Sequence, residues 1–364
     1  MKFKSFVDKV LSVPDPSIFQ QPIAKHNRAW FKIMKSQIHK IFTMTRTRQM
    51  GIYYELDEIP RFPPGSRLLL VYDGIVHLGD ALMDLAGRAL LEEHSVKMDV
   101  VLDPALLPVF ESDPWFSRIY TDINQVQAKD YAFVILNTLN RRVIKKKARS
   151  SLRDLSFTSL VGWFIDRRFY NKIQFSYYSW SRILGLGRSS AELQAEARVV
   201  MGSPIEKAGL SQIVIAIGGK EADRTYLRWS EVLHLVDQDK KLSQYKYVLI
   251  GSRNGLSEAQ TLLSQKFENI NLISYVDTLT LHQTREVIGN STLFLGADGG
   301  LMHVTNTTNT PILALFSAEV DPRARCVENQ HFNCKFIRSA GDVSEIDPKT
   351  VARELALALN AGKI

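Results

Sequence analysis

The stretch RLLLVYDGIVHLGDALMDLA, from Arg67 to Ala86, decides the fold of this chain. Residues 67–72 form a short continuous apolar run, which is typical of a strand buried within a parallel β-sheet. After a loop, apolar residues recur at helical spacing from Gly79 to about His94. A buried strand that leads directly into a helix predicts an α/β fold, in which helices cover both faces of a parallel sheet.

The same alternation continues outward from this stretch. Further strands are predicted at residues 98–102, near 119–120 and at 131–136, whereas the pattern between 140 and 200 is indistinct. A second alternating series begins at Gln212. Its predicted strands are 213–217, 247–250, 270–273, 292–295 and 312–315, and its predicted helices lie around 228–240, 256–267, 279–288 and 301–308.

We therefore expect two doubly wound parallel-sheet domains, which also fits a length of 364 residues. A turn-like break at residues 201–204 marks the expected junction between them. The expected parts are a basic arm at 1–60, an N-terminal Rossmann-like domain at 61–200, a C-terminal Rossmann-like domain at 201–345 and a C-terminal helix at 346–364.

The composition is that of an ordinary globular protein, with 45% hydrophobic and 23% charged residues. No apolar run approaches the roughly 18–20 residues that span a bilayer, and the N-terminus lacks the apolar core of a secretory signal. The two cysteines, Cys326 and Cys334, belong to no His or Cys motif, which argues against a zinc site and against a disulfide-stapled secreted domain. We expect a cytoplasmic protein.

The charge of the chain is concentrated in the arm. Residues 1–50 hold ten Lys or Arg and two Asp, which accounts for the whole net charge of +8. Residues 25–45 have the pattern of a basic amphipathic helix. Such a helix either binds an anionic partner, such as the inner face of the cytoplasmic membrane, or packs on the body of the protein. No nucleic-acid-binding module is recognisable, so nucleic acid is not an expected partner.

The loop after the first strand contains His77, Gly79 and Asp80. Ligands of open parallel sheets bind outside the carboxyl ends of the strands, where this loop lies. Gly79 permits close approach of the backbone, and Asp80 falls in the first turn of the predicted helix. Asp80 is therefore a candidate for a ligand-facing carboxylate, although an acid at this position can also simply complement the helix dipole.

A second strand–loop–helix junction reads GADGGLMH, from Gly296 to His303. The free amides of a glycine-rich turn and of a helix N-terminus form an anion site that suits a diphosphate. Asp298 is placed to fix the loop or a ribose hydroxyl, and His303 lies one turn into the helix. Capping of the helix by Asp298, with glycines serving the turn, is the alternative.

These two junctions resemble motifs of glycosyltransferase family 9, the ADP-heptose:lipopolysaccharide heptosyltransferases. Residues 298–304 and 311–316, DGGLMHV and PILALF, resemble the family signature D-[ST]-G-x-x-H…P-x-x-A-L-[FY]-G. Residues 79–83, GDALM, resemble the G-D-x-[VL]-[LM] loop that holds the family's catalytic aspartate. The resemblance covers residues from about 66 to 320. It implies a GT-B fold with two Rossmann-like domains facing a central cleft, and an inverting transfer that needs no metal or other cofactor.

Three positions depart from the family pattern. Gly299 stands where a Thr or Ser would donate a hydroxyl to the phosphate, and Ser317 stands where the family has Gly. Leu227 occupies the position expected for a lysine that touches the diphosphate. The cation is then expected to come from another member of the same segment: Lys220, Arg224 or Arg228.

The expected roles follow from these matches. Asp80 is the expected catalytic base, because the attacking acceptor hydroxyl must lose its proton. The ADP-linked sugar donor is expected to contact one set of residues: Asp298, Gly299, Gly300, Leu301, His303, Glu258 and one or more of Lys220, Arg224 and Arg228. The acceptor, a phosphorylated glycolipid, is expected to contact a second set: His77, Gly79, Arg141, Arg142 and Lys145. For Glu258 and for the basic run 141–153, a solvated helix surface is the alternative interpretation.

The leading hypothesis is a glycosyltransferase that moves heptose to a lipopolysaccharide-type or other surface-glycan acceptor. A nucleotide-sugar epimerase of the same architecture and a catalytically silent sugar-nucleotide-binding scaffold remain as alternatives. A dinucleotide oxidoreductase is disfavoured, because neither predicted domain has G-x-G-x-x-G after its first strand.

Overall fold

The computed structural model describes residues 35, 38, 39, 42, 43, 46, 51–161, 170–206 and 208–361. The chain divides into two compact units, the first ending at Ala197 and the second beginning at Arg198. This division lies a few residues before the break at 201–204. Most of the arm, including most of the amphipathic helix predicted at 25–45, lies outside the described residues.

The first unit contains a five-stranded, fully parallel sheet in the order β3-β2-β1-β4-β5. Four of its strands were predicted, and only their bounds differ by a few residues. The fifth, β5, was missed because three residues are too few for a periodic signal. The strands are β1 (Arg67–Tyr72), β2 (Lys97–Leu102), β3 (Phe116–Tyr120), β4 (Phe133–Leu136) and β5 (Phe157–Ser159).

The helix predicted from Gly79 to about His94 is in fact two elements. The α-helix α3 (Leu78–Asp84) is followed by the 3₁₀-helix η3 (Ala86–Glu93). The change of helix type coincides with a close approach of η3 to another helix: a Cβ at Gly87 would lie 2.6 Å from the carbonyl oxygen of Ser176. The neighbouring Arg88 is fully buried and binds the carboxylate of Asp113 through two nitrogens, at 2.9 and 2.7 Å.

Three further α-helices follow in this unit. They are α5 (Arg141–Arg149), α6 (Lys172–Leu184) and α7 (Ser190–Glu196); a short helix α4 (Leu107–Phe110) and several 3₁₀ turns complete the unit. The sequence pattern did not reveal α6, because three of its serines (176, 179 and 181) are buried along with its apolar residues, so that no polar stripe is visible.

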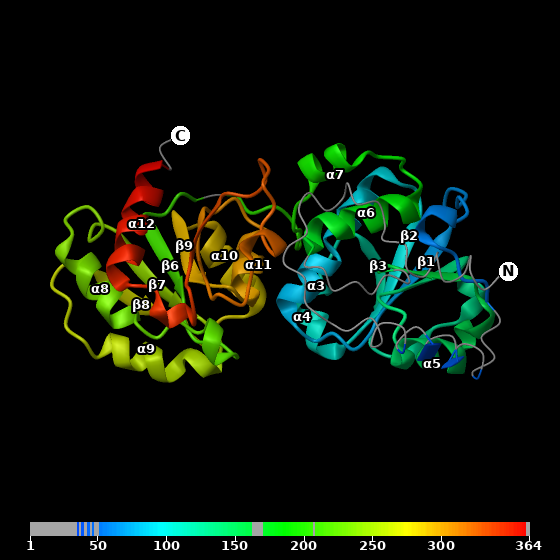
Figure 1. The fold of residues 1–364 in the computed structure, drawn as a ribbon, viewed down its shortest axis with the longest axis horizontal. Helices are drawn as coiled ribbons and strands as arrows, with labels where there is room; N and C mark the ends of the chain where they lie inside the picture. The colour runs from blue at the N-terminus through cyan, green and yellow to red at the C-terminus, as the bar shows by residue number, and fades with distance from the viewer. Residues whose placement is uncertain are drawn as a thin grey trace. The chain divides into compact units, whose positions relative to one another are not determined.

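The two faces of the first sheet are covered by different helices. Val143 and Ile144 of α5 pack with strand residues such as Leu69 and Val71 in one apolar cluster. The α6 helix lies on the opposite face, against α3 and η3 (Figure 1). This arrangement brings the N-terminal parts of α5 and α6 toward the loops that follow the central strands.

The second unit contains a six-stranded, fully parallel sheet in the order β11-β10-β9-β6-β7-β8. The predicted strands are all present, and the edge strand β11 was missed because all five of its residues are exposed or half-buried. The strands are β6 (Gln212–Ala216), β7 (Lys246–Ile250), β8 (Asn271–Ser274), β9 (Leu293–Ala297), β10 (Ile312–Phe316) and β11 (Cys334–Arg338). Both cysteines are free thiols, with their Sγ atoms 3.4 Å apart.

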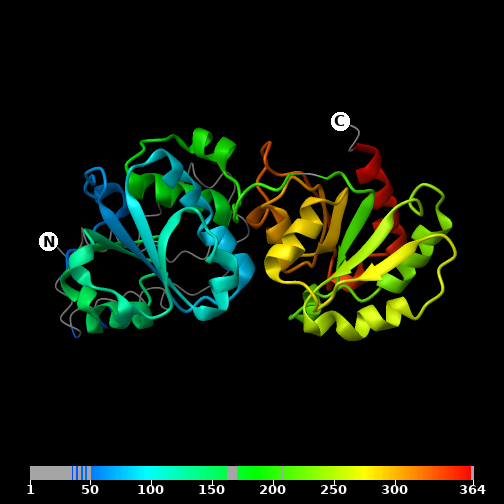
Figure 2. The same cartoon turned by 180° about the vertical axis from the view of Figure 1, so that it is seen from behind.

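The helices of the second unit also cover both faces of the sheet (Figures 1 and 2). They are α8 (Trp229–Gln238), α9 (Leu256–Leu263), α10 (Leu281–Gly289), α11 (Gly300–Thr305) and α12 (Pro348–Ala361). Residues of α8, α9 and α12 share one apolar cluster with the sheet, so these three helices lie on the same face. The predicted C-terminal helix thus packs within the second unit. Among the described residues, no helix is long and apolar enough to cross a bilayer.

Both sheets have the strand order of doubly wound folds, so the prediction of two such domains is confirmed. The direction of winding reverses between two neighbouring strands, which are β1 and β4 in the first sheet and β6 and β9 in the second. Ligands of such folds bind at this point, outside the carboxyl ends of the strands. The loops after these four strands are therefore where the functional residues of each unit are expected.

Candidate functional site

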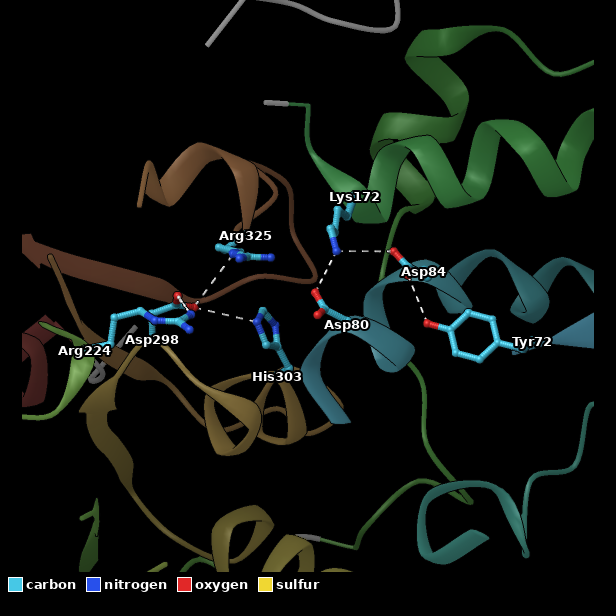
Figure 3. Close-up of polar contacts among 8 residues, drawn as sticks. All are labelled: Tyr72, Asp80, Asp84, Lys172, Arg224, Asp298, His303 and Arg325. Carbon is cyan, nitrogen blue, oxygen red and sulfur yellow. Dashed lines mark hydrogen bonds and ion pairs between the residues drawn. The ribbon is translucent and has the colours of Figure 1, made fainter. Parts of the chain in front are cut away.

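In the first unit, Asp80 lies in the first turn of α3, just beyond the loop that follows β1. Its Oδ1 atom accepts a hydrogen bond from the Lys172 ammonium at 2.6 Å (Figure 3). Asp80 therefore does more than complement the helix dipole, because its carboxylate also binds a cation from α6. The predicted neighbours His77, which is exposed at the N-cap of α3, and Gly79, in its first turn, flank this position.

A second carboxylate, Asp84, lies one helical turn beyond Asp80. The Lys172 ammonium is 3.7 Å from Asp84 Oδ1, and the Tyr72 hydroxyl donates a hydrogen bond to Asp84 Oδ2 at 3.0 Å. Burial raises the pKa of Asp84, and the positive charge of Lys172 opposes that rise. Burial and the charge of Asp84 raise the pKa of Tyr72 well above its usual range, so Tyr72 is a neutral donor to Asp84. The sequence pattern indicated neither Lys172 nor Tyr72.

A basic pair from α5 reaches the loop after β1. Asp73, at the end of that strand, accepts from Lys146 Nζ at 2.6 Å and lies 3.0 Å from Arg142 Nε. The side-chain amide of Asn137, which follows β4, donates a hydrogen bond to the backbone carbonyl of Asp73 at 2.9 Å. A Cβ at Gly74, whose φ is +80°, would meet the Arg142 guanidinium at 3.7 Å. The two loops at the reversal point are thus tied together, with two cations beside them.

The predicted acceptor residues of α5 do not all lie on this side. Arg142 contacts the loop after β1, as does Lys146, which was not among the candidates. The charge of Arg141, desolvation and the charges of Arg149 and Arg46 lower the pKa of Lys145, so these four side chains form a separate basic group. The basic run therefore presents two groups of cations rather than one.

Lys147, in the same run, is a core residue. Its ammonium donates to the carbonyl oxygens of Arg153 and Leu155, at 3.1 and 2.8 Å, and lies 4.5 Å from the centre of the Phe157 ring. Burial lowers the pKa of Lys147 to about 7. The interpretation of the run as a uniformly solvated helix is therefore wrong at this position.

This burial predicts a pH dependence of stability. Between the pKa of Lys147 in the folded protein and about 10.4 in the unfolded chain, only the unfolded chain binds the proton, so the free energy of unfolding rises with pH. The rise is at most about 4 kcal/mol from pH 7 to 10, and the carbonyl contacts reduce it because they favour the charged form. Urea unfolding at pH 7 and 9.5 should show this rise in the natural protein and in the surface control Lys129→Met, but not in Lys147→Met. An equal rise of the free energy of unfolding in all three proteins would contradict this prediction.

In the second unit, Asp298 follows β9 at the reversal point and is almost fully buried. Three cationic or titratable side chains converge on its carboxylate (Figure 3). Arg224 Nη1 lies 3.3 Å from Oδ2, while His303 Nε2 and Arg325 Nε lie 3.8 and 4.0 Å from Oδ1. The contact with Arg224 joins the segment after β6 to the loop after β9. Arg325, which follows β10 and a 3₁₀ turn, carries no sequence signal that marks it as part of this group.

The alternative of a simple helix cap is not supported at this junction. Gly299, and not Asp298, is the N-cap residue of α11, and glycine has no side chain that could cap the helix. Gly299 has an extended backbone with φ −177°, and a Cβ on it would meet only the Ala297 carbonyl oxygen, at 3.8 Å, so nothing in the backbone requires glycine. Gly300 and Leu301 form the first turn of α11, and His303 is buried one turn further.

The structure separates the three candidate cations. Arg224 contacts Asp298, whereas Arg228 binds Glu231 of its own helix through two hydrogen bonds of 2.7 Å. Lys220 is exposed in the loop after β6. Leu227, in the position expected for a lysine, is 68% exposed. Arg224 is therefore the candidate cation of this segment that contacts Asp298.

Glu258 also reaches the reversal point. It accepts a hydrogen bond from the backbone amide of Gly218, just after β6, and burial raises its pKa. A Cβ at Gly218, whose φ is +76°, would lie 2.8 Å from Gly255, so the loops after β6 and β7 touch through glycines. Glu258 is thus not a merely solvated acid.

This arrangement suits an anionic ligand. The first amides of α11 point away from the helix, and the two arginines add positive charge beside a buried carboxylate that holds them in place. Within the described residues, no group of three or more His, Cys, Asp or Glu side chains is placed to hold a metal ion.

Comparison with known proteins agrees with this description. Residues 186–345 match the model of glycosyltransferase family 9 (heptosyltransferase), and no curated protein sequence matches the chain. Among solved structures, a glycosyl transferase family 9 protein from Veillonella parvula DSM 2008 has a TM-score of 0.65 at 16% identity, covering 82% of this chain and 98% of its own.

Two Escherichia coli proteins are also similar. ADP-heptose lps heptosyltransferase II has a TM-score of 0.63 at 16% identity, covering 82% of this chain and all of its own. Heptosyltransferase WaaC, solved with ADP, has a TM-score of 0.57 at 15% identity, covering 80% and 99%. These similarities confirm the predicted GT-B type of fold. The family match of residues 186–345 supports the predicted glycosyltransferase activity. Residues 186–345 therefore resemble glycosyltransferase family 9, and the chain has the two-domain fold of the heptosyltransferases.

Proposed function

We propose that the protein is an inverting, metal-independent glycosyltransferase that transfers heptose from ADP-heptose to a lipopolysaccharide, lipooligosaccharide or other surface-glycan acceptor. One observation carries the proposal. Within the part that matches the family, Asp298 joins Arg224, Arg325 and His303 at the point where the strand order reverses. A similar structure was solved with ADP and another with ADP-2-deoxy-2-fluoro heptose, which favours an ADP-linked donor here.

The donor half of the reaction needs stabilisation of a leaving group. The nucleoside diphosphate gains negative charge as the bond to the sugar breaks, and fixed cations and helix amides lower the energy of that charge. Arg224 and Arg325, oriented by Asp298, would supply this stabilisation together with the amides at Gly299 and Gly300. Glu258 is placed beside the glycine loops as a candidate ribose contact.

The acceptor half needs a base. In an inverting transfer the acceptor hydroxyl attacks in one displacement and gives up its proton, so a carboxylate must lie within hydrogen-bonding reach of it. Asp80 is the proposed base, because residues 79–83 resemble the loop that holds the family's catalytic aspartate. The proposed contacts for a phosphorylated acceptor are Arg142 and Lys146 of α5, together with His77 and Gly79 at the start of α3.

A binding screen tests the donor assignment. Calorimetry with ADP-heptose, GDP-mannose and UDP-glucose should give the tightest binding for ADP-heptose. Turnover then separates the alternatives, because an epimerase would change the nucleotide sugar without an acceptor, and a silent scaffold would bind it without turnover.

The basic arm is proposed to hold the enzyme at an anionic membrane surface, where a lipid-linked acceptor is found. Each Lys or Arg close to such a surface contributes about 1 kcal/mol, and salt screens the attraction. The full chain should therefore bind vesicles that contain phosphatidylglycerol at low salt and release them at high salt. A chain without residues 1–50 should not bind, while it should keep activity on a soluble acceptor. A lower melting temperature of the shortened chain, with no vesicle binding by the full chain, would show instead that the arm packs on the body.

A further inference from the structure

Two carboxylates of α3 point toward one lysine. Asp80 and Asp84 are four residues apart on the helix, so their side chains lie on the same face, where like charges repel. The Lys172 ammonium lies 2.6 Å from Asp80 and 3.7 Å from Asp84, between the two (Figure 3). One cation thus offsets the repulsion between two acids.

The position of Lys172 is set by the packing of α6. Lys172 is the first residue of that helix, and the Asn171 side chain caps it by accepting from the amides of residues 173 and 174. One turn further, the Ser176 hydroxyl donates a hydrogen bond to the backbone carbonyl of Asp84 at 2.7 Å and accepts one from the backbone amide of Gly87 at 2.9 Å. The start of α6 is therefore fixed against α3 and η3 by hydrogen bonds.

Asp84 is fixed from its other side by β1. The Tyr72 hydroxyl donates to one oxygen of Asp84, while Lys172 approaches the other. Tyr170, next to the start of α6, is half-buried, and desolvation and the charge of Asp84 raise its pKa. Lys172 from α6, Asp84 from α3 and Tyr72 from β1 are thus described titratable groups that interact with Asp80, whereas Tyr170 interacts with Asp84.

We propose that Lys172 is a positioning residue for Asp80, with Asp84 as the second counter-ion of its ammonium; this rests on the proposed role of Asp80 as the base. A base must be ionised before it accepts a proton, and a cation at hydrogen-bonding distance favours the ionised carboxylate. When Asp80 takes the acceptor proton, it loses its charge. The partly buried Lys172 then keeps Asp84 as its partner and does not become an unpaired charge, whose burial would be costly.

The test compares Lys172→Met with Lys172→Arg and with Lys129→Met, which removes an exposed lysine of the same unit. Lys172→Met should lower kcat by roughly 10- to 100-fold, leave the KM for the donor unchanged and move the acidic limb of the pH–rate profile up by about one pH unit. Lys172→Arg should restore most of the rate and the position of the limb. Lys129→Met should behave as the natural protein does.

Three results would overturn the inference. A lower melting temperature with an unmoved acidic limb would mean that Lys172 is only structural. A higher KM for the acceptor with an unchanged limb would mean that Lys172 binds substrate directly. Normal rate and profile in Lys172→Met would mean that it does not act on Asp80 at all.

A measurement without turnover separates this inference from the proposed function. The carboxyl carbon of Asp80, followed by NMR as pH is varied, should titrate at higher pH in Lys172→Met than in the natural protein. If this shift is present but neither protein transfers sugar, the positioning role stands and the proposed reaction fails. If transfer depends on Asp80 but the titration does not move, the reaction stands and the positioning role fails.

Discussion

Replacing Asp80 with asparagine is expected to lower the rate of sugar transfer by at least two orders of magnitude. A general base contributes roughly 10²- to 10⁴-fold, and asparagine keeps the shape of the side chain but cannot take the proton. Donor affinity should change little, because the donor contacts proposed above lie in the second unit. Steady-state rates with donor and acceptor both saturating, together with calorimetry of the donor, measure the two effects separately.

Asp57→Asn is the matched control for this experiment. Asp57 also pairs with a cation of α6, Arg182, at 3.2 Å, but on the surface of the unit. Its replacement should leave the rate unchanged. Near-normal transfer by Asp80→Asn would remove Asp80 from the role of base.

The second large effect is expected at Arg224. Arg224→Met should weaken binding of ADP-heptose by roughly 10- to 100-fold, since hydrogen bonds to charged groups contribute about 1.5–3 kcal/mol, and it should also lower kcat. Arg325→Met should act in the same direction, because both guanidinium groups lie by Asp298. Calorimetry with ADP and with ADP-heptose measures the change.

Arg228→Met is the control, four residues along the same segment. Arg228 is bound to Glu231 on the surface of α8, so its loss should alter donor affinity less than twofold. If Arg228→Met weakened binding as much as Arg224→Met did, the cation of this segment would be wrongly assigned.

The parts of the fold that were predicted correctly are those with a local periodic signal. The continuous apolar run of β1 and the junction from β9 into α11 are visible in the sequence, because burial in a parallel sheet selects apolar residues at every position. The α6 helix was missed because buried serines and tyrosines hide its apolar face. The break between α3 and η3 was missed because it depends on contact with α6, which no local pattern records.

The residues of the candidate site also fall into two groups, those with a local sequence signal and those that only tertiary packing reveals. Asp80, Asp298 and His303 stand within motifs of fixed spacing, so the resemblance to a family identified them. Lys172 and Lys146 contact residues that are 92 and 73 positions away in the chain, and Arg325 is likewise distant from its neighbours in the loop after β9. Such residues become candidates only when the packing of α5, α6 and the segment after β10 is known.

One measurement tests the central claim most directly. The full chain is incubated with ADP-heptose and a lipooligosaccharide acceptor in the presence of EDTA, and ADP and the new glycosidic linkage are followed by NMR. The account predicts that ADP forms together with a heptosylated acceptor of inverted anomeric configuration, and that neither forms with Asp80→Asn. Donor binding without transfer, an altered nucleotide sugar, or a product of retained configuration would contradict it.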